Sequence, residues 1–315
     1  MKKNFSLSAF LSLQIADVTT IVFLNLLSLL HLFFYTRIAD WYVFVSLNSA
    51  LSAAIFFLAQ KTTLSSPLSL RLLRHWYLAP MILYIFKETY FMVHPIHPAD
   101  FDWLLINIDY SIFGVHPTQW IMRFANPVMT ELLQISYASY YILLITPMYE
   151  LYREEKFEDF YWGAFLIIYG FYLSYIGYFL LPAVGPRFTL HNFLSVDAEL
   201  PGIFFTQYLR DFVNAGESIP KGIANAVQFA QRDVFPSGHT QLTLVTLYVA
   251  FTKKIKSRWV MLIFGLLLIV STVYLRYHYV VDVACGILFF IFTIWSGKKI
   301  NSWWNSVRAV KVELN

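Results

Sequence analysis

The sequence has little charge and almost no cysteine. Only 13% of its 315 residues are charged, whereas 58% are hydrophobic and the mean hydropathy is +0.57. A soluble domain carries about a quarter charged residues, so this composition excludes an ordinary soluble protein. The single cysteine, Cys285, excludes an internal disulfide and a cysteine-based metal cluster. Its apolar surroundings indicate a small packing residue.

Long apolar runs account for most of this composition. A bilayer core needs roughly 20 mostly apolar residues per helix. Eight stretches qualify, so the sequence predicts an all-α, polytopic integral membrane protein with about eight transmembrane helices. They cover residues 14–35, 40–60, 73–93, 128–149, 159–181, 238–252, 259–277 and 279–296. The last two nearly touch, which predicts a tight hairpin whose tip carries "LRYHY".

Positive charge gathers on one side of this topology. The termini and the loops near 61–72, 150–158 and 253–258 hold Lys2, Lys3, Lys61, Arg71, Arg74, Arg153, Lys156, Lys253, Lys254, Lys256, Arg258, Lys298, Lys299, Arg308 and Lys311. The short loops opposite hold Arg37, Arg123 and Arg276. The positive-inside rule therefore predicts cytoplasmic termini and an external loop over 182–236. The run "KKIKSR" is then a cytoplasmic anchor, and no nucleic-acid partner is expected.

Two segments before the external loop raise separate questions. The N-terminal "MKKNFSLSAFLSL" lacks a small-residue cleavage site, which favours an uncleaved first helix. "HPIHPADFD", over 94–102, has metal-ligand residue types, but its prolines disrupt helical spacing, so an interfacial loop is favoured and no metal site is expected. Lys87 and Glu88 lie inside the third predicted span, where charge is costly. They either pair with other helices or line a substrate groove.

Three external segments carry residues suited to phosphate chemistry: "LLPAVGPRF", "FPSGHT" and "YLRYHYVVDVACG". In the third, His278 and Asp282 lie four residues apart, on one face of a helix. A carboxylate placed there can hold one imidazole nitrogen and leave the other as a directed nucleophile or base. Asp282 needs such a partner because an unpaired aspartate in a membrane helix is costly.

The other two segments supply an anion site. In "FPSGHT", Ser237 can cap the following helix, and Gly238 lets a phosphate approach the free backbone N–H groups. His239 can then donate a proton to a departing oxygen. The guanidinium of Arg187 suits phosphate oxygens, and Arg276 can add a second. The set predicts phosphoryl transfer through a phosphohistidine, without a metal or another cofactor.

The order of these motifs resembles the type-2 phosphatidic acid phosphatase (PAP2) superfamily. The family pattern is K-x6-R-P, then P-S-G-H, then S-R-x5-H-x3-D. The second element matches in full at Pro236 to His239, and the third matches its H-x3-D part at His278 and Asp282. The resemblance implies a six-helix catalytic membrane domain over 73–297. Two additional N-terminal helices would then occupy 1–72, and a cytoplasmic tail 298–315.

The resemblance also implies roles for the site residues. His278 corresponds to the nucleophile, Asp282 to its orienting partner and His239 to the general acid for the leaving group. The phosphate ligands would be Arg187, Ser237 and Gly238.

The chain departs from the family pattern at two places. Thr272 stands where the family has an arginine, with Arg276 nearby instead, and Arg187 follows a proline rather than preceding one. "GPRF", "YLRYHYVVD" and "IDYSIFGVHPTQW" look more like the branch that contains inositol phosphorylceramide synthases. Enzymes of that branch pass a phosphorylated head group to a lipid alcohol instead of to water.

The expected function is hydrolysis of a lipid phosphate or pyrophosphate, with an amphiphilic lipid phosphate as the substrate. The alternative is head-group transfer to a lipid alcohol as second partner. A lesser alternative is a non-catalytic lipid-binding or transport protein. A haloperoxidase shares the oxyanion site, but the membrane composition argues against it. The compact length suggests a prokaryotic inner (plasma) membrane, with the active site on the external, periplasmic side.

Overall fold

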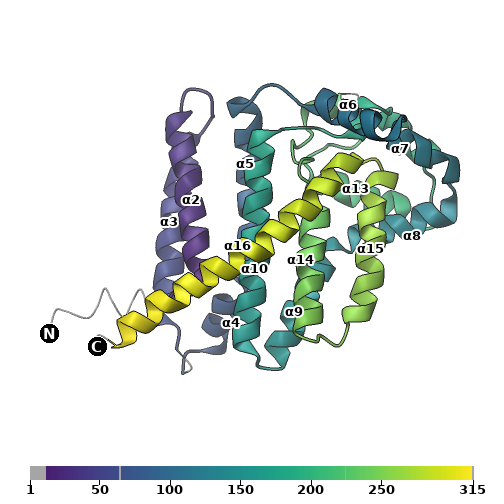
Figure 1. The fold of residues 1–315 in the computed structure, drawn as a ribbon. Helices are drawn as coiled ribbons and strands as arrows, with labels where there is room; N and C mark the ends of the chain where they lie inside the picture. The colour runs from purple at the N-terminus through teal and green to yellow at the C-terminus, as the bar shows by residue number, and fades with distance from the viewer. Residues whose placement is uncertain (1–11, 64, 224, 314–315) are drawn as a thin grey trace.

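The chain folds into a bundle of helices (Figure 1). A computed structural model describes residues 12–63, 65–223 and 225–313; 76% is helical and no described residue lies in a strand, so the all-α prediction is confirmed. The longer helices are α2 (Ile15–Phe33), α3 (Trp41–Lys61), α4 (Leu68–Trp76), α5 (Leu78–Ile96), α6 (Asp102–Phe113), α8 (Pro127–Ala138), α9 (Tyr140–Arg153), α10 (Phe157–Leu180), α13 (Thr206–Gly216), α14 (Gly238–Thr252), α15 (Arg258–Tyr274) and α16 (Val280–Glu313). Short helices α7 (Pro117–Trp120), α11 (Pro186–Thr189) and α12 (Val196–Glu199) lie between them.

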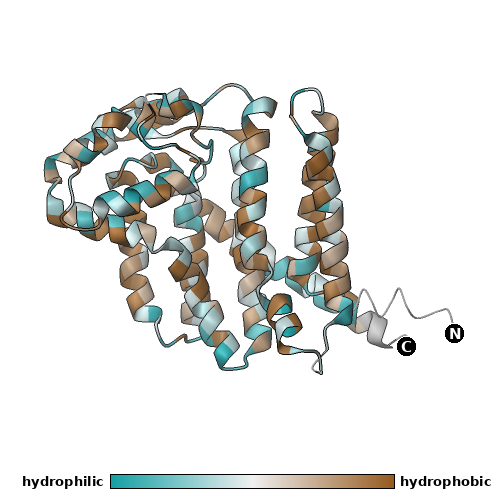
Figure 2. Ribbon diagram, turned by 180° about the vertical axis from the view of Figure 1, so that it is seen from behind, coloured by the Kyte–Doolittle hydropathy of each residue, from teal (hydrophilic) through white to brown (hydrophobic). Residues whose placement is uncertain are grey.

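The helices form an upright bundle that is closed at one end. α2 and α3 stand together at one edge, α5 and α10 lie in the middle, and α9, α14 and α15 lie toward the other edge (Figure 1). α16 crosses the bundle obliquely and packs on α14 and α10. α6, α7 and α13 lie across one end, hereafter the cap end (Figure 1). Hydrophobic residues dominate the long helices, and many hydrophilic ones gather in the connections at the ends (Figure 2).

Fewer helices than predicted can cross a membrane alone. All eight predicted stretches are largely helical, but among the described residues only α2, α3, α10 and α16 are long and apolar enough to span. A fifth span results if α8 and α9, bent by 48°, count as one. α14 has 15 residues and α15 has 17, so at about 1.5 Å per residue both are shorter than a core of about 30 Å. The count of about eight is not confirmed, although the apolar helices are consistent with an integral membrane protein.

The C-terminal part of the chain continues the last long helix. α16 has 34 residues, so the predicted boundary at 297/298 between catalytic domain and tail falls inside a continuous helix. At the other end of the chain, most of the proposed "MKKNFSLSAFLSL" helix start lies outside the described residues.

A buried ion pair joins α2 to the rest of the bundle at the end opposite the cap. Both guanidinium nitrogens of Arg74, in α4, donate to the Asp17 carboxylate, at 2.8 and 2.5 Å. The Tyr77 hydroxyl donates to the same carboxylate at 2.5 Å. Because all three side chains are buried, the contact fixes how α2 packs against α4 and α5.

A second buried cluster lies within the helices and explains Glu88. Its carboxylate contacts His31 of α2 at 3.0 Å and accepts a hydrogen bond from Asn48 of α3 at 2.6 Å. Asn48 in turn accepts one from the Tyr84 hydroxyl at 2.8 Å. Lys87 points elsewhere and donates to the Gly216 carbonyl at 2.7 Å, at the end of α13. Glu88 therefore pairs with other helices, whereas Lys87 reaches the cap end.

Candidate active site

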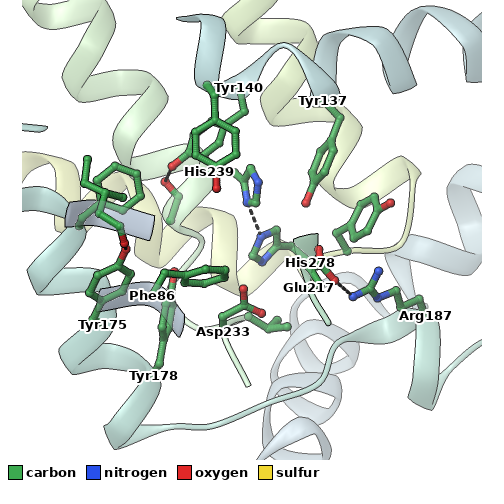
Figure 3. A pocket seen from close by; sticks show the side chains of 16 residues that line it. Phe86, Tyr137, Tyr140, Tyr175, Tyr178, Arg187, Glu217, Asp233, His239 and His278 are labelled. Atoms are coloured by element: carbon green, nitrogen blue, oxygen red, sulfur yellow. Dashed lines mark hydrogen bonds and ion pairs between the residues drawn. The ribbon is translucent and has the colours of Figure 1, made fainter. Parts of the chain in front are cut away.

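Two histidines meet under the cap, although 39 residues separate them in the chain. His239 lies in the first turn of α14, and His278 lies in the short turn between α15 and α16. His278 Nε2 is 3.5 Å from His239 Nδ1 (Figure 3). His278 is buried at 3% exposure, and both rings face the same cavity. The structure thus brings together two of the side chains that the sequence selected.

Asp282 lies behind His278, in the first turn of α16. One carboxylate oxygen is 3.6 Å from His278 Nδ1, which is within ion-pair range but longer than a hydrogen bond. The same oxygen accepts a hydrogen bond from the Tyr279 N–H at 2.8 Å. The contact directs Nδ1 toward the carboxylate and leaves Nε2 facing His239.

Arg187 reaches the cavity from α11 and is held on several sides. Its guanidinium forms an ion pair with Glu217 and a 3.3 Å hydrogen bond with Asn214, both at the end of α13 (Figure 3). It also lies 4.8 Å from the ring centres of Phe188 and Tyr277. The carboxylate of Glu217 therefore occupies the position that an anionic ligand of Arg187 would take.

The start of α14 has the expected cap, but only one of its two phosphate-binding candidates lines the cavity. The Ser237 hydroxyl caps the helix by accepting a hydrogen bond from the Thr240 N–H at 3.2 Å, but Ser237 is fully buried and does not line the cavity. Gly238 does line it. A Cβ on Gly238 would lie 2.7 Å from the Tyr178 hydroxyl, so the close approach of this tyrosine requires the glycine.

Arg276 does not join the other candidates. Its guanidinium lies 2.6 Å from the Glu199 carboxylate and 3.1 Å from Met122 Sδ. Together with His191 these residues line a separate, open pocket. Arg276 contributes to the site through its backbone only, because its carbonyl accepts a hydrogen bond from the Arg187 N–H at 3.0 Å. The expectation of a second phosphate-binding guanidinium does not match this placement.

The cavity between these residues is small and has two kinds of wall. Its volume is about 60 Å³, room for about two waters or a small anion. One wall carries the titratable groups: Arg187, Glu217, Asp233, His239 and His278. The other is apolar and includes Ile82 and Phe86 of α5 and Phe171 of α10. A separate apolar pocket of about 70 Å³ between α5, α9 and α10 shares Ile82 with it.

A stack of aromatic rings fixes His239. Tyr137 stacks on it with ring centres 4.7 Å apart, and Tyr140 covers its other side at 4.4 Å. Tyr137 also stacks on Tyr277 at 4.3 Å, and Tyr277 is the ring that contacts Arg187. The rings therefore connect the general-acid candidate to the anion-binding arginine.

Comparison with known proteins assigns the chain to a family. The PAP2 superfamily profile matches residues 103–296, more than half of the 315 residues. The chain belongs to the PAP2 superfamily. The match begins in α6 and ends in α16, so it includes every side chain of the titratable wall.

A named relative supports this assignment. A PA-phosphatase related-family protein of Dictyostelium discoideum is 28% identical over 192 residues, which cover 55% of this chain and 33% of the relative. The chain thus spans about a third of that relative's length. No solved structure matches. PAP2 membership supports an enzyme of the phosphatase-related type that acts on a lipid phosphate.

Two carboxylates of α6 position the loops of the PAP2 site. Asp102 accepts hydrogen bonds from the Val184 and Gly185 N–H groups, at 3.0 and 2.8 Å, just before Arg187. Asp109 accepts from the Val280 and Val281 N–H groups, at 2.8 and 2.9 Å, just after His278. The two are seven residues apart, hence on one face of the helix. Asp102 belongs to the segment that resembles a metal site, and here it binds backbone.

Burial changes the pKa of several groups in the cavity, and it lowers the pKa of His239 to about 4. It lowers the pKa of His278 well below its usual value, and the neighbouring His239 and Arg187 add to this effect. The imidazole is therefore neutral and available as a nucleophile at neutral pH. Burial, and then the charge of Glu217, raises the pKa of Asp233 to about 7.

Several residues of the site escaped sequence reasoning. Glu217 and Asp233 lie in the long external loop, where charges of both signs are ordinary. Asp233 is only six residues before His239, and this proximity was a usable signal. Tyr137 and Tyr140 come from "SYASYY", which places one ring before and one ring after the α8–α9 break. Belts of tyrosine at membrane surfaces have the same composition, so the pattern alone did not single them out.

Proposed function

We propose that this PAP2 protein cleaves an amphiphilic lipid phosphate or pyrophosphate through a phosphohistidine. Binding of the anionic phosphate raises the pKa of the neighbouring His239, which takes up a proton. His278 Nε2 attacks phosphorus, the bond from phosphorus to the lipid oxygen breaks, and His239 donates this proton to that oxygen. A hydroxyl then attacks phosphorus, the N–P bond breaks and the hydroxyl proton passes to His239. The observation that carries this proposal is the 3.5 Å approach of the two imidazoles in a cavity that also holds Arg187.

The remaining polar groups support binding of the phosphate. Arg187 and the N-terminal backbone of α14 at Gly238 offer donors to its oxygens. Asp282 keeps the His278 ring oriented. Because Glu217 now pairs with Arg187, an incoming phosphate has to take the place of that carboxylate. Ser237 and Arg276 are left out of this phosphate site because neither side chain lines the cavity.

The apolar wall supports a lipid substrate. Ile82 lines both the polar cavity and the apolar pocket of α5, α9 and α10, so the two spaces adjoin, and we expect an alkyl chain of the substrate to lie along this side chain. Turnover of a lipid phosphate that lacks such a chain should therefore be slower.

The proposed site faces outward, and both ends of the chain face the cytoplasm. The first residues of α2, the last of α16 and the basic turns after α3, α9 and α14 all lie at the end opposite the cap (Figure 1). All of these segments lie at one end of the bundle, as the positive-inside rule requires.

Head-group transfer to a lipid alcohol is the second candidate. The likeness to inositol phosphorylceramide synthases rests on "GPRF" and "YLRYHYVVD", and the Arg187 N–H to Arg276 carbonyl hydrogen bond joins these two segments. A non-catalytic lipid carrier would need no nucleophile, yet His278 has its Nε2 facing the cavity.

Trapping the covalent intermediate tests the mechanism. The purified protein is mixed with a lipid phosphate, quenched in alkali because phosphohistidine is labile in acid, and digested for mass spectrometry. We expect a phosphoryl group on the peptide that contains His278, and none in His278→Asn. His116→Ala, outside the cavity, serves as the matched control. Turnover by His278→Asn at the wild-type rate would overturn the mechanism.

A further inference from the structure

A second pocket adjoins the catalytic cavity at the cap end. Its volume is about 260 Å³, compared with about 60 Å³ for the cavity. The end of α5, from Thr89 to Pro95, forms one side, and residues 228–233 form the other. Tyr178 and Asp233 line both spaces, so they stand at the junction between them (Figure 3).

One polar side chain at this pocket lacks a partner, and a second is bonded only to its own backbone. Gln231 is 3% exposed, and its amide nitrogen has no hydrogen-bond partner within the described part of the chain. A buried amide left unpaired is costly, which indicates that a ligand or water completes it. No other described residue donates a hydrogen bond to the Asp233 carboxyl. The pocket therefore offers one donor and one acceptor within a small region.

The guanidinium that lines the pocket already has partners, and the nearby Lys87, which does not line it, is bound elsewhere. Arg232 pairs with Asp100, at 3.2 and 3.4 Å, and donates to the Ala230 carbonyl at 2.7 Å. Lys87 is held by the Gly216 carbonyl and the Ser218 hydroxyl. No free cation is thus left among the described residues here to bind a second phosphate. The donor amide of Gln231 also disfavours a cationic ligand.

A hydroxyl group matches this set, because it can accept from an amide and donate to a carboxylate at once. We propose that the pocket binds an uncharged, hydroxyl-bearing acceptor for the phosphoryl group, with Gln231 and Asp233 as its ligands. This inference rests on the phosphohistidine mechanism proposed above. It makes the acceptor an alcohol that enters beside Tyr90 and the half-exposed ring of Phe91.

The transfer step takes place where the second pocket meets the catalytic cavity. The acceptor oxygen attacks the phosphorus held on His278 Nε2, so an O–P bond forms and the N–P bond breaks. The acceptor proton passes to His239, which lost its own proton to the first leaving group. Asp233 holds the hydroxyl in place, and is in this sense a positioning residue.

The test measures how the phosphoryl group divides between glycerol and water. The enzyme in detergent receives a lipid phosphate with glycerol, and glycerol phosphate and inorganic phosphate are both quantified. We expect the ratio of glycerol phosphate to inorganic phosphate to fall at least about fivefold in Gln231→Leu. Gln60→Leu is the matched control: its amide nitrogen is also unpartnered, but it lies in α3 far from the pocket, and the ratio should stay unchanged.

A second variant and two further acceptor alcohols test the same inference. If Gln231→Leu does not fold, Asp233→Asn keeps the shape of its side chain and should lower the same ratio. Ethanolamine and n-butanol, tested at the same concentration, should each accept less phosphate than glycerol. An unchanged ratio in both variants, no glycerol phosphate from the wild type, or a preference for ethanolamine or butanol would overturn the acceptor pocket alone. Absence of any lipid phosphate cleavage by the wild type would instead overturn the proposed function.

Discussion

Two histidines of this protein lie against carboxylates, in different regions of the bundle. His31 is 3.0 Å from Glu88 among α2, α3 and α5, and His278 is 3.6 Å from Asp282 under the cap. The first pair is closed off by Asn48, which donates to the same carboxylate. At the second, the other imidazole nitrogen faces His239 and a cavity. Contact between a histidine and a carboxylate is thus not enough to mark a candidate active site. The adjacent cavity and its further charged groups distinguish His278 from His31.

The physical requirement on the two regions also differs. Polar groups among lipid-facing helices have to satisfy each other, because no water reaches them. The His31 cluster meets this requirement in part: His31 Nε2 and the Asn48 amide both contact Glu88 Oε1, which orients α2 and α3 against α5, whereas His31 Nδ1 and Glu88 Oε2 have no partner among the described residues. The groups of the cavity have to be available to a ligand, so several of them keep only partial partners. Substitutions should therefore affect activity in one region and stability in the other.

The largest effect is expected at the imidazoles of the cavity. His278→Ala should reduce lipid phosphate cleavage to background, because the nucleophile is gone. His239→Ala should slow it by about 10²- to 10⁴-fold, the usual contribution of a general acid. Phosphate release measured in mixed micelles checks both, with thermal unfolding to confirm that the variants are folded. Substantial activity in His278→Ala would show that His278 is no more catalytic than His31.

A smaller loss is expected at the anion-binding side chain. Arg187→Lys keeps the charge but loses the planar fork and its stacking between Tyr277 and Phe188. A charged hydrogen bond contributes about 1.5–3 kcal/mol, so kcat/KM should fall roughly 10- to 100-fold. Steady-state kinetics over a range of lipid phosphate concentrations checks this. Unaltered kinetics would mean that Arg187 serves only to hold Glu217.

Substitution of Glu217, the partner of Arg187, should strengthen substrate binding instead of weakening it. Glu217→Gln removes the charge that a phosphate has to displace, so KM should fall by about threefold to tenfold. Steady-state kinetics measures this change in KM. Asp211→Asn, at the partly exposed Asp211 of α13, is the control. An increase in KM would show that Glu217 assists binding instead of competing with it.

Substitution of His31, which is buried among α2, α3 and α5, should affect stability. His31→Ala leaves Glu88 with one partner fewer, at a cost of about 1–3 kcal/mol in the free energy of unfolding. The melting temperature in detergent should fall, while kcat per folded molecule stays at the wild-type value. A selective loss of kcat would show that this region takes part in the chemistry.

The last effect concerns the pH dependence of stability and Asp233. The folded state raises the pKa of this carboxyl from 3.8 to about 7, so it holds a proton that the unfolded chain releases. The stability from this group is therefore greatest below about pH 4 and is lost as pH rises to about 7, by at most about 1.4 kcal/mol per pH unit. Asp233→Asn should remove this slope. Melting temperatures at pH 4.5 and 7 compare the two proteins, and equal slopes would contradict the shift.

Local pattern was enough to predict the helices and to select His239, His278 and Asp282 as catalytic candidates, for physical reasons. Apolar runs have to become helices in a bilayer, and Pro-Ser-Gly before such a run marks a helix start whose cap is Ser237. The four-residue spacing of His278 and Asp282 places them one turn apart, whatever the rest of the chain does.

Other features depend on tertiary contacts that spacing does not encode. Arg276 has a φ of 68° and pairs with Glu199, and Gly238 is needed for the close approach of Tyr178, which comes from α10. The number of spans depends on where helices break, and one residue, Ser139, bends the α8–α9 pair. Glu217 reaches Arg187 only because α13 folds back over the cavity.

The carboxylates of α6 have a mechanical consequence. Asp102 holds the loop that carries Arg187, and Asp109 holds the turn that carries His278. One helix thus contacts the two segments that carry the proposed phosphate ligand and the proposed nucleophile. A displacement of α6 is therefore expected to move Arg187 and His278 together and to leave the distance between them unchanged.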